Sequence, residues 1–419
     1  MNSEPISIRG RTRAELADAL VEIGATLAAF GCPSYRLEDV IRVVARAEGY
    51  RAEPFALPTG LFLRITPLDG EVSAPEVHRM VRIKEWGVDL ARLVTVDEIF
   101  NDVLAKRSSI EKARARIKEV VAAPPTWSRG VVWLATAVSS GAAAVFFRGS
   151  LVDVALAALV GAVIGAGRAI LGQPAQRLLH DFLGGLFAAA CAGLAARIFP
   201  SVAPEVVMLA GAISLFPGMT FTTGLAEVAQ KNLVSGGARL MESASTLLLI
   251  LFGVALVGSV QQLAGPTIGP PPIRQGLGLG ADTIALVAAS LSFGVIFQMP
   301  RRFLGAALAS GAVGYSVAAF AGRHLPANSG HVAMFFAALA VCMLANALAR
   351  VTERPAQLFQ LPGMMLLVPG SFGFLSLGEF LSGNVDGGAR NGFTMVLVSA
   401  ALVIGVLVAN VLVPPRKIL

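Results

Sequence analysis

The strongest constraint on this chain is a series of long apolar segments that begins at residue 129. Each segment is about long enough for a ~30 Å hydrocarbon core at a helical rise of about 1.5 Å per residue. Inside hydrocarbon every backbone polar group must be bonded within the protein, and helices meet this condition. The sequence therefore predicts a mainly α, polytopic membrane protein with about ten transmembrane helices. The expected spans are 130–147, 151–170, 178–198, 204–222, 240–262, 281–299, 303–321, 331–349, 361–377 and 392–413.

Composition separates these segments from the N-terminal part of the chain. Hydrophobic residues make up 55% of the sequence and charged residues 15%, with a mean hydropathy of +0.70, far above that of an ordinary soluble protein. Residues 1–128 nevertheless hold 18 of the 34 Lys+Arg and 18 of the 27 Asp+Glu. We predict a soluble cytoplasmic domain over 1–125, a first membrane repeat over 126–265 and a second over 275–419.

The N-terminal part has the pattern of a small α+β domain. Apolar residues at helical spacing predict three helices, and Ser34 is suited to cap the second. β-branched and aromatic residues bounded by Pro and Gly predict short strands. The expected helices are 12–30, 34–48 and 96–121, and the expected strands lie within 54–67 and 78–86.

Charge and leader patterns indicate where the chain resides. The net charge of +7 arises in the hydrophobic part and lacks a basic cluster with interleaved aromatics, which argues against nucleic acid and favours loops facing anionic membrane lipid. The N-terminus lacks a signal-peptide pattern, and eleven loop Lys/Arg on the domain's side face five on the other. We expect a multi-pass membrane protein with both termini cytoplasmic. Cys32, Cys191 and Cys342 are expected to be reduced.

An internal duplication is the most informative feature for function. The segment that begins at Ser214 reappears from Leu366, at an offset of about 152 residues. Five expected helices thus repeat as five helices, and an odd number inverts the second copy relative to the first, as in many transporters. The matched residues are Pro217-Gly218 with Pro369-Gly370, Glu227 with Glu379, Asn232 with Asn384, and the GGAR motif at 236–239 with that at 387–390.

The Pro-Gly pairs are the candidate substrate-binding positions. Proline inside an apolar helix removes a backbone donor and crowds the preceding turn, and glycine permits an unwound turn. The half-helix that follows presents free N–H groups and partial positive charge, which suit a carboxylate. The alternative is that these breaks are structural kinks. The candidates are Pro217, Gly218, Thr220, Thr222, Thr223, Pro369, Gly370, Ser371 and Ser376.

Titratable residues near the breaks are candidates for proton coupling. Burial can raise a carboxyl pKa far enough for the group to carry protons. Glu227 and Glu379 are the first candidates, and Asp181 beside His180 is the second. The alternative is a carboxylate that pairs with a nearby arginine to close a turn. Asn232, Arg239, Asn384 and Arg390 are candidates for gating or for meeting a substrate anion in the vestibule.

Three segments together resemble the bacterial threonine/serine exporter family: GCPSYRLEDVIRVVARAEG at 31–49, PEVVMLAGAISLFPG at 204–218 and LVPGSFGF at 367–374. The resemblance covers nearly the whole chain and implies a fused form of two units that are separate polypeptides in some relatives. It implies export of threonine and serine driven by the proton motive force, or, by analogy with two-chain relatives, export of dicarboxylates such as succinate. It implies a location in the bacterial inner membrane and supplies no residue-level site.

Two other classes compete with a secondary transporter. A membrane-bound hydrolase would need a catalytic group, and Cys32, His78 and Asp39 are the residues that could assemble a thiol site. A sensor would not need an internally duplicated bundle. Metal-ligand spacings, phosphate-binding loops and nucleophile elbows do not occur in the sequence, so we expect no metal and no cofactor. The expected partners are a small-molecule substrate, protons and lipid, with a homo-oligomer possible.

Overall fold

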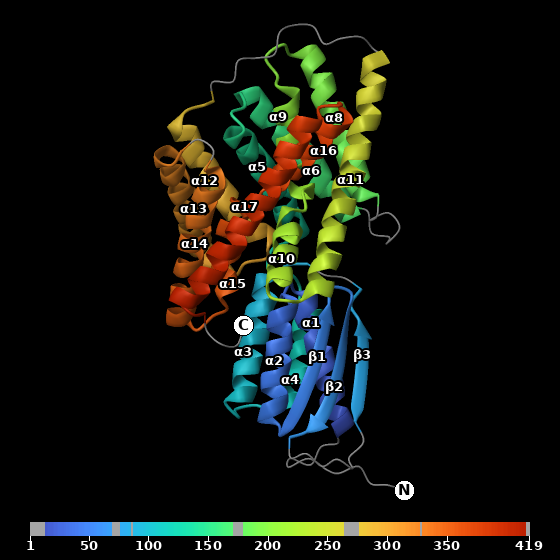
Figure 1. Ribbon diagram of the computed structural model, residues 1–419, viewed down its shortest axis with the longest axis vertical. Coiled ribbons are helices and arrows are strands. Elements are labelled where there is room, and N and C mark those ends of the chain that lie inside the picture. Colours follow the sequence, from blue (N-terminus) through green and yellow to red (C-terminus); the bar gives the residue numbers. More distant parts are fainter. Residues whose placement is uncertain are drawn as a thin grey trace.

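The computed structural model describes residues 13–68, 76–84, 87–170, 179–263, 276–326 and 329–415. An N-terminal domain lies at one end of a long helical bundle (Figure 1). It consists of an antiparallel sheet in the order β1-β2-β3 with helices packed on one face. Its elements are α1 (Arg13–Ala29), α2 (Ser34–Ala47), β1 (Tyr50–Leu57), β2 (Gly60–Pro67), β3 (Val77–Arg82), α3 (Leu90–Leu104) and α4 (Ile110–Ala122).

The core of the domain follows from one-sided covering of this sheet. Residues of β1 alternate between buried and exposed, as expected when helices pack on one face only. Leu61 and Ile65 of β2 and Leu20 of α1 are all fully buried. Gly24 lets α1 approach the sheet closely, since a Cβ at that position would lie 2.5 Å from Cδ2 of Leu61. The α+β architecture expected near the N-terminus is thus present.

The single helix expected over 96–121 is wrong. The structure has two helices there, α3 and α4, separated by a turn. Lys106 adopts a left-handed φ of 59°, and the Ser109 hydroxyl then accepts a hydrogen bond from Lys112 N to begin α4. At the other end, Asp89 caps α3 by accepting from Arg92 N. Side-chain capping therefore determines these boundaries. The apolar periodicity continues across the turn, so it does not reveal the break between the two helices.

The rest of the structure is helical and has two runs. The first run comprises α5 (Arg129–Phe146), α6 (Leu151–Ile170), α8 (His180–Ile198), α9 (Pro204–Gly211), the short 3-10 helix η1 (Ile213–Leu215), α10 (Gly218–Ala229) and α11 (Leu233–Leu263). The second run comprises α12 (Leu279–Ile296), the 3-10 helix η2 (Arg301–Phe303), α13 (Leu304–His324), α14 (Gly330–Thr352), α15 (Ala356–Met365), α16 (Gly370–Leu381) and α17 (Val385–Leu412).

Length and apolar composition mark these helices as a membrane bundle. Within the described residues, eight helical segments are long and apolar enough to cross a membrane, and the bent pair α9–α10 could form a ninth. The described apolar part of α6, Leu151–Gly167, is slightly shorter. The expectation of ten spans stays a prediction, with α6 as the tenth candidate.

Two helices begin earlier than the sequence suggested. The structure starts α11 at Leu233 and α17 at Val385, whereas apolar composition alone gave 240 and 392. The side chain of Asn384 caps α17 by accepting from Gly387 N. Both GGAR motifs therefore lie in the first turns of helices rather than in loops.

The two broken helices take opposite courses through the bundle. In Figure 1, α10 lies beside the N-terminal domain, whereas α9 lies toward the far end. For the second pair, α15 lies near the domain and α16 lies toward the far end. Passing from α9 to α10 therefore leads toward the domain, and passing from α15 to α16 leads away from it.

Small residues allow close helix packing in both runs. A Cβ on Gly161 would lie 2.2 Å from Oγ of Ser140, so α5 and α6 are in near-backbone contact. A Cβ on Gly185 of α8 would lie 2.3 Å from the carbonyl oxygen of Ile250 on α11. The corresponding pair α14 and α17 meets at Gly405, where a Cβ would lie 2.9 Å from the carbonyl oxygen of Phe335.

The linker after the domain is attached to the second run. Trp127 N donates to Oε1 of Gln298 at 2.8 Å, and its indole Nε1 donates to the carbonyl of Met299 at 2.8 Å. The guanidinium of Arg301 lies 4.9 Å from the Trp127 ring centroid. The residues that lead into α5 are thus held by the connection between α12 and α13.

Candidate functional site

The helix breaks of the two runs meet inside the bundle. A Cβ built on Gly218 would lie 2.9 Å from the backbone nitrogen of Gly370, and one built on Gly370 would lie 3.3 Å from Cα of Gly218. The rings of Phe216 and Phe374 stack beside this contact with centroids 5.1 Å apart. Pro217-Gly218 and Pro369-Gly370, which match in the duplicated sequence, therefore lie side by side.

Proline ends one helix and begins the next at each break. Pro217 precedes α10 and Pro369 precedes α16, and α9 and α10 are bent by 42°. The carbonyl of Pro217 accepts from Phe221 N at 2.9 Å, and that of Pro369 accepts from Phe372 N at 3.2 Å. Each half-helix therefore starts at the crossing, where its first N–H groups carry partial positive charge.

The hydroxyl groups near the crossing are not equivalent. Thr222 is buried, and its Oγ1 has no hydrogen-bond partner among the described residues. Ser376 is also buried, but its Oγ donates to the carbonyl of Gly388 at 2.7 Å and so joins α16 to α17. Thr222 therefore offers an unused hydroxyl, whereas that of Ser376 is occupied. The other hydroxyl candidates, Thr220, Thr223 and Ser371, are half-buried.

Glu227 lies at the end of α10 that faces the N-terminal domain and is completely buried. One carboxylate oxygen accepts from Ser34 N at 3.1 Å. The other accepts from Ser235 Oγ at 2.7 Å and from Arg239 Nε at 3.1 Å. Ser34 Oγ and Ser235 Oγ are also hydrogen-bonded, at 2.7 Å. The turn-closing pair with Arg239 is therefore present, and the N-terminal domain takes part in it.

Glu379, the matching residue of the second run, has a different environment. It is half-buried and accepts from Nδ2 of Asn384 at 2.7 Å. Arg390 is exposed, and within the described residues it forms no ion pair with Glu379. The pair that closes the turn in the first run is thus replaced by an Asn–Glu hydrogen bond in the second.

The two matching asparagines both begin a helix. The Asn232 carbonyl accepts from Gly236 N at 2.9 Å, and its own N–H donates to the carbonyl of Glu227 at 2.9 Å. Asn384 N likewise donates to the carbonyl of Glu379 at 2.9 Å. These contacts assign both asparagines a structural role at the turn after the half-helix.

Comparison with known families agrees with this arrangement. Residues 18–261 match a family model described as "Putative threonine/serine exporter", and residues 282–412 match a second described as "Threonine/Serine exporter, ThrE". The first match alone covers more than half of the chain. The chain belongs to the threonine/serine exporter family. Because both units are present in one polypeptide, it is a fused member, as the sequence resemblance implied.

Relatives of this exporter-family chain include fungal membrane proteins. It is 23% identical over 433 residues to an uncharacterized protein of Schizosaccharomyces pombe, covering 92% of this chain and 50% of the relative. It is 22% identical over 364 residues to "Pheromone-regulated membrane protein 10" of Yarrowia lipolytica, covering 81% of this chain and 28% of the relative. The chain thus spans half or less of the length of these relatives. No solved structure matches it.

Asp181, the remaining proton-coupling candidate of this exporter-family chain, is engaged near the start of α8. Its Oδ1 lies 3.5 Å from Nδ1 of His180. The other ring nitrogen of His180 lies 3.2 Å from the carbonyl of Ile164, which ties α8 to α6. These contacts connect neighbouring helices and do not involve the Pro-Gly crossing.

Two further buried carboxylates, Asp153 and Asp282, have structural roles. Asp153 accepts from Ser150 N at 2.8 Å and from Ala203 N at 2.9 Å, which joins the start of α6 to the start of α9. Asp282 pairs with Arg148 at 3.0 Å and joins the end of α5 to α12. Both lie at helix ends, as expected of capping residues.

The thiol site considered for a hydrolase is not assembled. Cys32 is buried, and desolvation raises the pKa of its thiol to about 12, so the reactive thiolate is disfavoured. His78 is exposed on β3 and contacts Glu76. Asp39 pairs with Arg42 on the surface of α2. The three residues therefore act separately, and membership in an exporter family agrees with a role other than catalysis.

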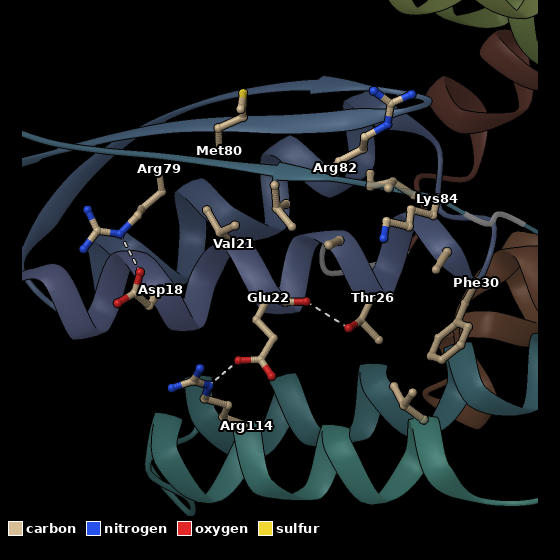
Figure 2. Close-up of a pocket in the computed structure, with 15 residues that line it drawn as sticks. Asp18, Val21, Glu22, Thr26, Phe30, Arg79, Met80, Arg82, Lys84 and Arg114 are labelled. Atoms are coloured by element: carbon tan, nitrogen blue, oxygen red, sulfur yellow. Dashed lines mark hydrogen bonds and ion pairs between the residues drawn. The ribbon is translucent and has the colours of Figure 1, made fainter.

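The N-terminal domain has a cleft of about 520 Å³ between α1, β3 and α4. Figure 2 shows two ion pairs at its edges, Arg79 with Asp18 and Arg114 with Glu22. Lys84 lies on the β3 side of the cleft. The ion pairs join α1 to both neighbouring elements, so the charged residues of the cleft contribute first to holding this domain together.

Proposed function

We propose that this chain is a secondary exporter that moves threonine and serine through a site at the crossing of the two helix breaks. The observation that carries the proposal is the direct contact between the Gly218 and Gly370 backbones. The opposite courses of α9–α10 and α15–α16 support a description of the two runs as inverted five-helix repeats. Such repeats place their substrate site where broken helices meet.

The chemistry of the crossing suits a small hydroxylated amino acid. The N-terminal N–H groups of α10 and α16 favour the substrate carboxylate, because each helix start carries partial positive charge. The Thr222 hydroxyl, which has no partner among the described residues, supplies a hydrogen-bonding group for the hydroxyl of threonine or serine. The breaks pack together here, so the two repeats must separate locally to admit a substrate.

Proton coupling and orientation belong to the same proposal. Glu227 and Glu379 are the coupling candidates because they lie near the ends of the half-helices α10 and α16 at matching positions. The N-terminal domain faces the cytoplasm, both termini lie on that side, and the membrane is the bacterial inner membrane. The proton motive force then drives efflux toward the side on which α16 ends.

Efflux from proteoliposomes tests this function. Purified protein is reconstituted with labelled threonine, serine or succinate inside, and efflux is followed after a pH gradient is imposed. We expect threonine and serine to leave faster when the gradient is present, and Thr222→Val to slow their efflux. Gly258→Ala is the control, because a Cβ on Gly258 meets nothing within 4 Å. Efflux of succinate alone would favour the dicarboxylate alternative, and no efflux would contradict the proposal.

A further inference from the structure

The N-terminal domain contacts both runs, and its contact with the second run is broad and apolar. Met299, Ala349 and Phe359 are buried in the same hydrophobic core as the residues of the domain. Leu90 N donates to the carbonyl of Phe297 at 2.9 Å, which places the start of α3 on the connection between α12 and α13. A contact with an apolar core and hydrogen-bonded backbone groups is expected to persist during the transport cycle.

The contact with the first run has a different chemistry. It centres on Ser34, whose backbone N–H and hydroxyl reach Glu227 and Ser235 respectively. These groups are polar, so water can replace each hydrogen bond when the surfaces separate. Glu227 also keeps Arg239 and Ser235 as partners from its own run. The Ser34 contact is therefore suited to opening, whereas the apolar contact with the second run is suited to staying closed.

From this difference we propose that the N-terminal domain moves with the second run as one body, and that Ser34 acts as a latch on Glu227 of the first run. Closing the latch holds the two runs together on the side of the domain, and opening it lets them separate there. The proposal rests on the exporter function proposed above, because alternating access requires such separation. It assigns the domain a regulatory role at the end of α10.

The side chains offer a cross-linking test with a matched control. In a background in which the three native cysteines are replaced, Ser34→Cys with Ser235→Cys places two thiols where hydroxyl oxygens now lie 2.7 Å apart, within reach of a disulfide. The control pair is Ala91→Cys with Gln298→Cys, where Ala91 N donates to the carbonyl of Gln298 at 3.2 Å. A protease site in the 123–125 linker reports cross-linking, since a cross-linked domain stays attached after cleavage.

The two cross-links have opposite expected effects on labelled threonine efflux. The Ser34–Ser235 disulfide should slow efflux about tenfold or more, with recovery on reduction, because both conformations must be accessible for transport. The control cross-link should leave the rate within about twofold, because it joins parts that move together. Unchanged efflux with the first cross-link, or arrest by the second, would overturn the latch. If the reduced proteins export nothing, the exporter proposal itself fails.

A second measurement tests the latch through distances within the protein and does not require transport. Ser34→Pro removes the N–H that Glu227 accepts, yet proline is tolerated in the first turn of a helix, and Pro33 with ψ 149° already has the conformation required before proline. Spin labels at exposed Met80 and Leu233 measure the distance between the domain and the first run. Labels at Met80 and Val351 measure the distance between the domain and the second run. We expect Ser34→Pro to broaden or lengthen the first distance distribution only. An unchanged first distribution, or an equal change in both, would contradict the latch.

Discussion

Glu227 and Glu379 occupy the same place in a duplicated sequence but have different surroundings. Glu227 is completely buried and has three hydrogen-bond donors, one from the N-terminal domain, whereas Glu379 is half-buried beside Asn384. The helix breaks that precede them are in mutual contact. The duplication therefore preserves the breaks, and the domain, which exists in one copy, makes the two ends of the molecule unequal.

The largest expected effect is that of Glu227→Gln. The change leaves Arg239 without its carboxylate in a site closed by the domain, and removing one partner of a buried pair costs on the order of 3 kcal/mol. We expect a thermal midpoint lowered by several degrees and weaker gradient-dependent efflux, because glutamine cannot carry a proton. Differential scanning fluorimetry and the proteoliposome assay measure the two. A variant with wild-type coupling would exclude Glu227 as a coupling residue.

Substitution of the crossing glycines tests whether the breaks are equivalent. Gly218→Ala and Gly370→Ala each force a methyl group against the opposite backbone, and overpacking of this kind costs about 1–3 kcal/mol. Both should lower threonine efflux to a similar extent. Gly237→Ala is the matched control, because a Cβ there meets nothing within 4 Å. A severe effect at one glycine alone would show that the two breaks are equivalent in structure but not in function.

The two buried hydroxyls should separate substrate binding from packing. Ser376→Ala removes a hydrogen bond to Gly388 and should cost about 1 kcal/mol of stability. Thr222→Val removes a hydroxyl without a described partner, so stability should be unchanged or slightly higher, while threonine efflux weakens. Thermal unfolding and the concentration dependence of efflux distinguish the two. The opposite pattern would remove Thr222 from the proposed site.

Among the variants that weaken a described contact, Glu379→Gln is expected to cost the least stability. Its hydrogen bond with Asn384 lies near the surface, where such contacts contribute under about 1 kcal/mol, and glutamine can retain a bond to the amide. Efflux should nevertheless lose part of its dependence on the pH gradient if Glu379 couples protons at the far side. Comparison with Arg390→Ala, which alters an exposed neighbour, separates coupling from surface charge. Full coupling in Glu379→Gln would leave Glu227 as the remaining candidate of the pair.

Local pattern predicted much of the fold. The positions of α6 and α8 and the breaks at Pro217 and Pro369 followed from apolar length and proline chemistry. The starts of α11 and α17 did not, because their first turns contain Gly, Ala and Arg rather than an apolar run. Likewise, the turn between α3 and α4 depends on the capping hydroxyl of Ser109 inside a continuous helical pattern.

The candidate site was predictable only in part, because some of its contacts join residues that are far apart in the sequence. The duplication identified Glu227 and both Pro-Gly pairs, since matched spacing is visible in the sequence. Ser34 was expected to cap α2, yet its hydroxyl pairs with Ser235 and its N–H with Glu227. That contact joins residues 193 positions apart, and one sequence carries no signal for such a pairing.

The attachment of Trp127 bears on how the protein assembles. This residue leads into the first run but bonds to Gln298 and Met299 of the second. The linker before the first run therefore binds the second run non-covalently, and this contact does not depend on a peptide bond between the two runs. A gene divided between α11 and α12 would yield two polypeptides in which the N-terminal one carries its own docking element for the other, so co-translated fragments should find each other without the covalent connection.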